Sequence, residues 1–398
     1  MQPLTLPAVF LLMIHTIALA DSKVPAKPPE APKRPVVDTY HGIEIIDPYR
    51  YMEDLKNPKT LSWMKAQSEY ASAALDGIPA KGKLLSRIEE LDKGAPFTIS
   101  HLSRLQDGTF FYHKLNADAE VRVVCSRESE NAAEKRVLDP KWYETEGGSH
   151  ASLEFFVPAP NGRFGVAGIS RGGSEITTIF VRDIGQGKDL PISIDRIETA
   201  YNEPQWLPDS SGFFYSRRQP LPKGAPASDT YKNTMCLLHK IWREVDQDTP
   251  VFGAGLVAGI KFEPMDFPSV RVYPGSEYVI GQIHHGDSQE LTLYTARLDA
   301  VGKGEIAWAK VCDASDGVVA YEVHGGFVYL VTAKGAPRFK VVRVPLAAPD
   351  FAKAEVVLAE SELVVTSVAA AKDAGFVNGT RNGSGVVVRL DATGKREP

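Results

Sequence analysis

The sequence has little cysteine and no excess of positive charge, and each shortage excludes a class of protein. Its 398 residues include three cysteines, Cys125, Cys236 and Cys312, which are far apart and never in C-x-x-C spacing. This set is too sparse for a disulfide framework, so we expect three small side chains that are buried or semi-buried. The formal net charge of −5 offers no basic surface. We therefore expect no nucleic-acid partner.

The first twenty residues differ in character from the rest of the chain. Residues 4–19 are mostly apolar, and Ala18-Leu19-Ala20 has the small-residue spacing of a cleavage site. We interpret residues 1–20 as a secretory signal peptide, even though no Lys or Arg precedes the apolar run. An uncleaved membrane anchor is the alternative, but the run contains Pro7 and falls short of the ~20 residues of a bilayer span.

Cleavage after Ala20 predicts an exported protein, periplasmic or extracellular, with no stable membrane association. Residues 21–35 are rich in Pro, Lys and Ala, which predicts an extended linker. We expect the product to be a monomer.

Residues 36–96 are predicted to form a short helical segment. Asn57-Pro58 has the side chains of an N-cap followed by a first helical position, and apolar residues continue at helical spacing to about Asp76. A second helix is expected from about Lys83 to Lys93, ended by Gly94 and Pro96.

Long stretches of helical spacing are missing from residues 97–398, where short strands alternate with Gly, Asn, Asp and Pro turns. The unit recurs every ~45–55 residues, which favours a mainly β fold, a β-propeller of about six blades, over a β-sandwich. The predicted strands are residues 109–113, 120–125, 164–169, 175–182, 212–217, 238–245, 278–283, 291–298, 326–332, 339–344, 375–378 and 385–390.

One stretch carries a family resemblance. Residues 47–55 read D-P-Y-R-Y-M-E-D-L, with Y-H-G at 40–42 just before them. This resembles the N-terminal region of the prolyl oligopeptidase family of serine peptidases, where D-P-Y-R-W-L-E-D is the usual form. Residues 168–175, G-I-S-R-G-G-S-E, and residues 206–215, W-L-P-D-S-S-G-F-F-Y, are similar to family motifs and come in the family's order.

The resemblance implies a seven-bladed propeller followed by an α/β-hydrolase domain that holds the catalytic Ser, Asp and His. The complete family enzyme cleaves short peptides after proline through an acyl-enzyme on serine. Because this chain reaches Pro398 before that domain would begin, we expect about six of the seven blades and no catalytic residues. The chain alone is then expected to be inactive, with short peptides as partners once a hydrolase domain is supplied.

Two other functions stay open at this point. The chain is either a secreted propeller that binds its partners without catalysis, or an unrelated propeller enzyme that uses Ser170 or the region of His284. Gly168 to Gly172 matches G-x-S-x-G, but a nucleophile elbow needs a helix after the serine, and the residues after Gly173 are rich in β-formers. A hairpin between two blade strands is therefore the expected structure around Ser170.

Other apparent catalytic or metal-binding patterns are expected to be loops. Gly147 to His150 lacks the trailing glycines of the family's nucleophile motif. His284 and His285 are adjacent, so on a strand they point to opposite faces and rarely share one ion. We expect no metal and no cofactor, and a solvated polar turn at these histidines.

Two further roles are predicted from the resemblance. Tyr201 lies near where the family places an aromatic residue of the substrate cavity, which would make it a substrate-gating residue; a tyrosine of a blade core is the alternative. Asp47, Arg50, Glu53 and Asp54 are expected to form a buried ion network. The family packs this segment on the hydrolase domain, so its apolar residues are expected to be exposed here.

Overall fold

The computed structural model describes residues 27–174, 176–304, 306–371 and 374–391. The predicted signal peptide and the first part of the linker lie outside these residues. The chain divides into two compact units, Met1–Pro96 and Phe97–Pro398. No helix in the described residues combines the length and the apolar character that a membrane crossing requires.

The first unit contains a β-hairpin and two helices. Strands β1 (Val36–Tyr40) and β2 (Ile43–Asp47) pair antiparallel. A 3-10 turn (Arg50–Glu53) leads to α1 (Pro58–Asp76) and α2 (Lys81–Asp92). Both helices confirm the prediction, and the Asn57 side chain accepts a hydrogen bond from the Lys59 N–H at 3.0 Å.

The hairpin was not predicted, although its turn residues are part of the Y-H-G motif. His41 and Gly42 have φ angles of 52° and 81°. Two successive positive φ values are what a two-residue hairpin turn requires, and glycine supplies one of them without strain. The motif therefore has a local structural role as a turn.

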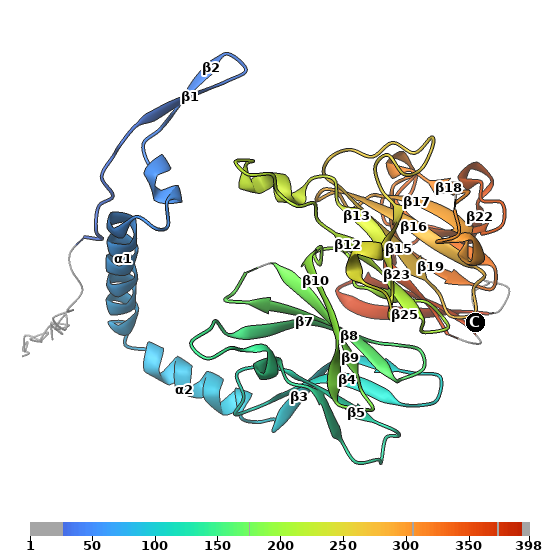
Figure 1. Ribbon diagram of the computed structural model, residues 1–398, viewed down its shortest axis with the longest axis horizontal. Coiled ribbons are helices and arrows are strands. Elements are labelled where there is room, and N and C mark those ends of the chain that lie inside the picture. The colour runs from blue at the N-terminus through green and yellow to red at the C-terminus, as the bar shows by residue number, and fades with distance from the viewer. Residues whose placement is uncertain (1–26, 175, 305, 372–373, 392–398) are drawn as a thin grey trace, which may run out of the picture. The chain divides into compact units, whose positions relative to one another are not determined.

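The second unit is a β-propeller of six blades in the described residues, numbered here in chain order (Figure 1). Blade 1 consists of β3 (Phe97–Arg104), β4 (Phe110–Asn116), β5 (Val123–Arg127) and β6 (Lys135–Leu138). Blade 2 consists of β7 (Ala151–Pro158), β8 (Phe164–Arg171), β9 (Thr177–Asp183) and β10 (Lys188–Ile197). Blade 3 consists of β11 (Gln205–Trp206), β12 (Gly212–Arg217), β13 (Met235–Lys240) and β14 (Thr249–Phe252).

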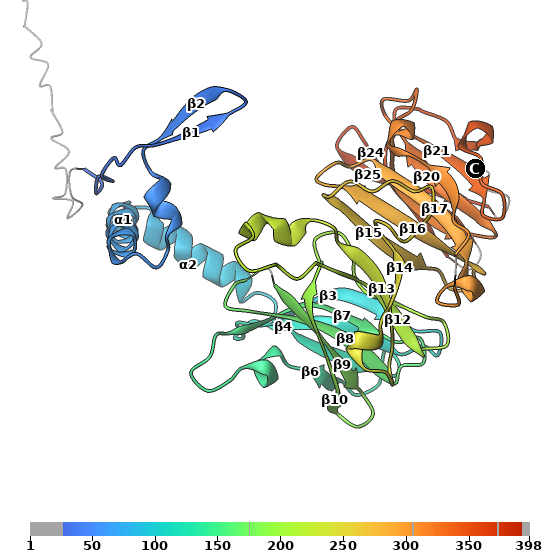
Figure 2. The same ribbon diagram turned by 45° about the horizontal axis from the view of Figure 1, so that its top comes forward.

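The remaining three blades follow the same meander, and the last has three strands (Figure 2). Blade 4 consists of β15 (Asp266–Val272), β16 (Tyr278–His285), β17 (Leu291–Arg297) and β18 (Ala309–Cys312). Blade 5 consists of β19 (Val318–His324), β20 (Phe327–Thr332), β21 (Lys340–Pro345) and β22 (Glu355–Leu358). Blade 6 consists of β23 (Val364–Ala370), β24 (Gly375–Arg381) and β25 (Ser384–Leu390). Short 3-10 helices lie at Pro140–Tyr143, Ala227–Tyr231, Val245–Gln247, Leu298–Ala300, Ala314–Asp316 and Phe351–Lys353.

Each predicted strand corresponds to the second or third strand of a blade, and one was misplaced. Residues 238–245 were predicted as a strand, but β13 ends at Lys240. The Arg243 N–H bonds to the Lys240 carbonyl, so residues after Lys240 form a turn in spite of the apolar Ile241 and Trp242. The three cysteines are free and buried, as predicted.

Apolar side chains hold consecutive blades together. Five clusters of buried side chains join blade 1 to 2, 2 to 3, 3 to 4, 4 to 5 and 5 to 6. Among the described residues, none of these clusters joins blade 6 to blade 1. The end blades accordingly keep apolar residues exposed, such as Leu102 at 62% and Val387 at 65%.

Blades 2 and 3 are also joined by backbone and by a buried ion pair. Ile197 of β10 pairs with Arg217 of β12, which links the two blades into one sheet. Next to this bridge, Arg218 Nε donates to Glu198 Oε2 at 2.7 Å, with both side chains almost fully buried. This pair lies directly before the connection that carries Tyr201.

Candidate functional site at the Tyr201 end of blades 3 and 4

Tyr201 lies in the connection between β10 and β11 and contacts the neighbouring blade. Its hydroxyl donates to Asp287 Oδ1 at 2.7 Å, and its ring stacks on His284 with centroids 4.8 Å apart. Phe267, near the start of β15, approaches from another side at 5.0 Å between ring centroids. Tyr201 is half-buried, so solvent still reaches part of this residue.

A buried carboxylate holds the connection in place. Glu198 Oε1 accepts from the Ala200 N–H at 2.8 Å, while its other oxygen is bound by Arg218. Arg218 in turn lies over the ring of Tyr231 at 4.5 Å. Because an unpaired buried carboxylate is costly, this arrangement fixes the backbone directly ahead of Tyr201.

Electrostatics keep the two rings of this surface, those of Tyr201 and His284, neutral. The hydrogen bond to Asp287, with burial second, raises the pKa of Tyr201 to about 12, so the phenol is a donor at neutral pH. Burial, assisted by Arg271, lowers the pKa of His284 to about 4, which leaves a neutral imidazole. The arrangement can stack on a flat or ring-shaped group and exchange hydrogen bonds, but it contains no activated nucleophile.

Beneath Tyr201 a buried polar chain joins three blades. The amide of Gln282 bonds to Asn202 Oδ1 at 3.5 Å, and the Tyr321 hydroxyl donates to Gln282 Oε1 at 2.6 Å. Asn202 Nδ2 and Ser269 Oγ are buried beside it without a partner in the described residues. This chain was missed by sequence reasoning because its members are more than 30 residues apart.

Ser170 is not a nucleophile in this structure. It lies in β8, which continues through a turn into β9, so the predicted hairpin is confirmed. Its hydroxyl donates to Glu154 Oε1 at 2.5 Å, and no histidine bonds to it among the described residues. Gly147 to His150 likewise form a loop, where exposed His150 contacts Glu144 at 3.2 Å.

The adjacent histidines are the last residues of β16, so the predicted solvated turn was wrong. His284 turns to Tyr201, whereas His285 bonds through Nδ1 to Asp266 and through Nε2 to Thr292, both at 2.8 Å. The Asp266 carboxylate raises the pKa of His285. His285 thus finds its partners within blade 4, whereas the His284 ring packs on the connection that carries Tyr201. Within the described residues, no group of three or more His, Cys, Asp or Glu side chains could hold a metal ion.

A second cluster of polar side chains, which no sequence pattern predicts, lies inside blade 3. His239 Nδ1 and Asp248 Oδ1 are 2.7 Å apart, and the Tyr215 hydroxyl donates to Asp248 Oδ2 at 2.6 Å. His239 and Asp248 are almost completely buried, and His239 Nε2 has no partner in the described part of the chain. No substrate could reach it, so it ties β12 and β13 to the residues before β14.

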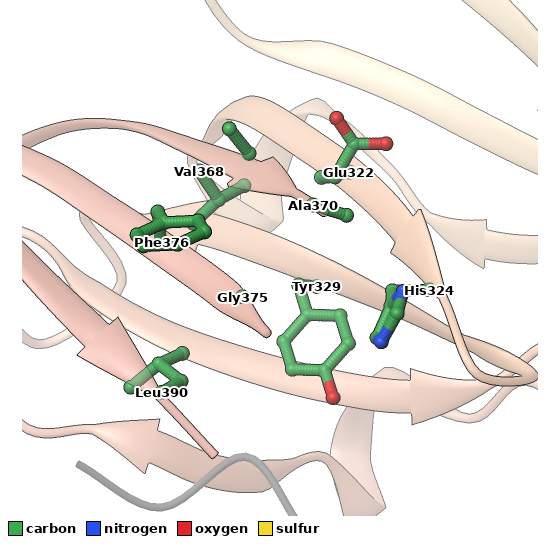
Figure 3. Close-up of a pocket in the computed structure, with 9 residues that line it drawn as sticks. Glu322, His324, Tyr329, Val368, Ala370, Gly375, Phe376 and Leu390 are labelled. Atoms are coloured by element: carbon green, nitrogen blue, oxygen red, sulfur yellow. The ribbon is translucent and has the colours of Figure 1, made fainter. Parts of the chain in front are cut away.

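A small cavity between blades 5 and 6 is shown in Figure 3. Glu322 and His324 of β19 and Tyr329 of β20 line it together with residues of blade 6 that include Val368 and Phe376. Burial raises the pKa of Glu322. The cavity volume of about 10 Å³ is at most the space of one water molecule, so it is no substrate site.

The ions of the N-terminal motif form a network that is partly exposed, not buried as predicted. Arg50 bonds to Asp38 at 2.5 Å and Asp47 at 2.9 Å, with Glu53 at 3.4 Å. The Asp54 carboxylate accepts from the Lys56 N–H at 3.0 Å instead of joining the network. The network fastens the hairpin to the 3-10 turn, since Asp38 and Arg50 belong to these two elements.

Comparison with known proteins relates this architecture to enzymes that are about twice as long. The chain is 25% identical over 360 residues to the prolyl endopeptidase of Elizabethkingia meningoseptica, covering 89% of this chain and 47% of that enzyme. It is 24% identical over 381 residues to the dual function macrocyclase-peptidase POPB of Galerina marginata, covering 89% and 50%. The chain therefore spans about half the length of the curated relatives it matches.

Solved structures of the same kind of enzyme resemble this chain as well. A prolyl endopeptidase from a study of inter-domain dynamics in two such enzymes has a TM-score of 0.78 and 27% identity, over 94% of this chain and 52% of that one. Substrate-bound prolyl oligopeptidase B of Galerina marginata shares the fold, with a TM-score of 0.73. The family described as prolyl oligopeptidase, N-terminal beta-propeller domain, matches residues 28–397, and the chain belongs to this family.

Proposed function

We propose that this chain is the N-terminal and propeller part of a serine endopeptidase that cleaves short peptides after proline. The observation that supports it is the family match over residues 28–397, together with relatives named prolyl endopeptidase. The catalytic Ser, Asp and His would come from a hydrolase domain. The residues described here then shape access to that site and do not perform the chemistry.

In this proposal Tyr201 is a gating residue. A neutral phenol held by Asp287 and stacked on His284 presents a ring face and a polar edge at the surface. The pyrrolidine ring of proline is compact and apolar enough to rest on such a face, and the polar edge can bond to a peptide group. Tyr201 would thus select and orient a peptide while the reaction takes place on other residues.

The first test asks whether the chain alone hydrolyses a proline reporter. Purified protein is incubated with acetyl-Gly-Pro-p-nitroanilide, and released nitroaniline is recorded. We expect no turnover above the buffer, because an enzyme without its nucleophile and base loses most of a rate enhancement of ~10⁶-fold or more. Turnover that disappears in Ser170→Ala would contradict the proposal and favour a propeller enzyme of another kind.

The second test supplies the catalytic residues by adding a hydrolase domain. Residues 27–398 are fused to the hydrolase half of the Elizabethkingia meningoseptica prolyl endopeptidase, and kcat/KM is measured on short and long proline peptides. The proposal expects cleavage of the short peptides and a several-fold loss with Tyr201→Ala, while Tyr278→Ala at the far end of β16 serves as the matched control. A folded fusion that retains peptides without cleaving them favours the alternative, a binding module without catalysis.

Export and the monomeric state are also proposals. If the signal peptide is cleaved after Ala20, the exported product begins at Asp21, which N-terminal sequencing determines. Sedimentation of that product should give the mass of one chain. A product that keeps Met1 and stays in the membrane fraction would support the anchor alternative.

A further inference from the structure

The connections between the first and second strands of blades 1 to 4 line an open cavity that the proposed function does not use. Its volume is about 390 Å³. Pockets that bind small ligands have volumes of ~300–1,000 Å³. The lining residues come from equivalent positions in the four blades and include Arg104, Gln106, Pro158, Gln205, Val272 and Pro274.

Contacts between blades hold this cavity in shape. The Trp206 indole N–H donates to the Val157 carbonyl at 2.9 Å, and the Asn161 N–H donates to the Ser210 hydroxyl at 3.1 Å. A Cβ atom on Gly162 would lie only 3.3 Å from Leu105. Blades 1, 2 and 3 are thus in direct contact around the cavity, so a ligand would meet a preformed site and lose little affinity to reorganisation.

The chemistry of the lining is apolar with one positive charge. Arg104 carries the single charge among the lining residues, all of which lie in the described part of the chain. Its guanidinium is 5.2 Å from the Phe110 ring centroid, and no carboxylate within the described residues pairs with it. The amide N–H groups of Gln205 donate to the carbonyls of Glu203 and Pro204, which leaves its Oε1 as an acceptor.

We propose that this cavity binds the C-terminal end of a short peptide whose last residues are apolar. The terminal carboxylate lies on Arg104, because a guanidinium binds a carboxylate through two parallel hydrogen bonds. The Gln205 Oε1 accepts a peptide N–H, and the apolar side chains occupy the space among Val157, Pro158 and Val272. Charge complementarity selects this occupant, since an apolar lining with one cation favours an anion attached to an apolar group.

This site is separate from the surface around Tyr201. Phe267, which contacts Tyr201, lies near the start of β15, whereas Val272 and Pro274 lie at its end. Val272 lies five positions beyond Phe267 along the strand, which is ~17 Å at about 3.3 Å per residue. Peptide binding here therefore does not depend on the proposed function.

Calorimetric titration of the full chain with acetyl-Pro-Leu tests the proposal. We expect saturable binding of the free acid. Its C-terminal amide should bind at least about tenfold more weakly than the acid, because the charge-assisted hydrogen bond to the carboxylate is lost. Arg104→Gln should weaken binding of the acid about tenfold. Gln106→Trp, which fills the cavity from an exposed turn without changing charge, should abolish it.

Arg163→Gln is the charge control, because the Arg163 guanidinium also lies over a phenylalanine ring, that of Phe164, and pairs with Asp183 at 3.5 Å, but does not line the cavity. This variant and Tyr201→Ala should bind like the parent chain. The proposal is overturned by undetectable binding at millimolar peptide or by an unchanged Arg104→Gln variant. Loss of binding in Tyr201→Ala, or hexanoate binding as tightly as the peptide, would also overturn it. If a variant that loses binding has the same unfolding midpoint as the parent chain, misfolding is excluded as the cause of that loss.

Discussion

The two units of this chain bury their apolar residues to very different extents. In the propeller, five clusters of buried side chains join neighbouring blades, and Phe213 and Leu293 are fully buried. In residues 27–96, Thr60 is the one buried side chain, while Leu84 of α2 is 62% exposed. Both units form regular secondary structure. Apolar patterning thus suffices to form the elements, but burial within the same unit is a separate property.

The largest effect is expected when one large apolar side chain is removed from each unit, which tests whether the two units differ in apolar burial. Phe213→Ala leaves a cavity between blades 2 and 3 and should lower the free energy of unfolding by about 3–5 kcal/mol. Leu85→Ala on α2 removes a half-exposed side chain and should change it by no more than about 0.5 kcal/mol. Urea titration followed by circular dichroism measures both, and equal midpoints for the two variants would refute the contrast.

Ion pairs offer a second comparison of the same kind. Arg218→Met leaves Glu198 buried without its partner, which should cost about 3–5 kcal/mol. Arg50→Met removes the centre of a network that water already reaches, so its urea midpoint should stay close to that of the parent.

The double variant Arg218→Met, Glu198→Leu controls for the charge itself. It should recover much of the loss, since two apolar groups leave no unpaired carboxylate. A double variant as unstable as Arg218→Met alone would show that the pair stabilises through its geometry, for instance through the Ala200 N–H that Glu198 also binds.

How far the sequence predicted the fold depended on where each strand lies in its blade. Every predicted strand was a second or third strand, such as β8 and β20. Except for β25 at the edge of blade 6, these strands are flanked on both sides, and they form apolar runs. First strands were missed for visible reasons: β3 is largely exposed, β11 has two residues, and β15 contains Pro268. The last strands of blades 1, 3, 4 and 5 have four residues each, too few to show a period.

The candidate sites were predictable only where the signal is local. The hairpin around Ser170 could be inferred because Gly172 and Gly173 follow it directly, and both have positive φ. The partners of Tyr201 could not, since Asp287 is 86 residues away and meets it only when blades 3 and 4 pack. The same holds for the cavity near Arg104, which four separate turns build.

The smallest expected effect is on how the stability of the propeller depends on pH. Burial lowers the pKa of His113, in blade 1, to about 4 from its ordinary 6.5. The unfolded chain therefore binds a proton more readily than the folded chain between pH 6.5 and 4. The stability that the neutral ring contributes is complete above pH 6.5 and is lost as the pH falls through this window, an effect on the order of 2–3 kcal/mol.

His113→Gln should make this part of the pH profile shallower, measured as urea midpoints at half-unit steps from pH 7.5 to 4.5. A slope remains, because burial also lowers the pKa of His284 in blade 4 to about 4, and that side chain contributes in the same window. His285 does not mask the effect, because Asp266 raises its pKa and its contribution is lost as the pH rises above 6.5. His150→Gln is the matched control, since His150 lies on an exposed loop of the same propeller. If His113→Gln and His150→Gln give the same profile, burial in blade 1 does not govern the acid sensitivity of the propeller, and the two units differ in packing alone.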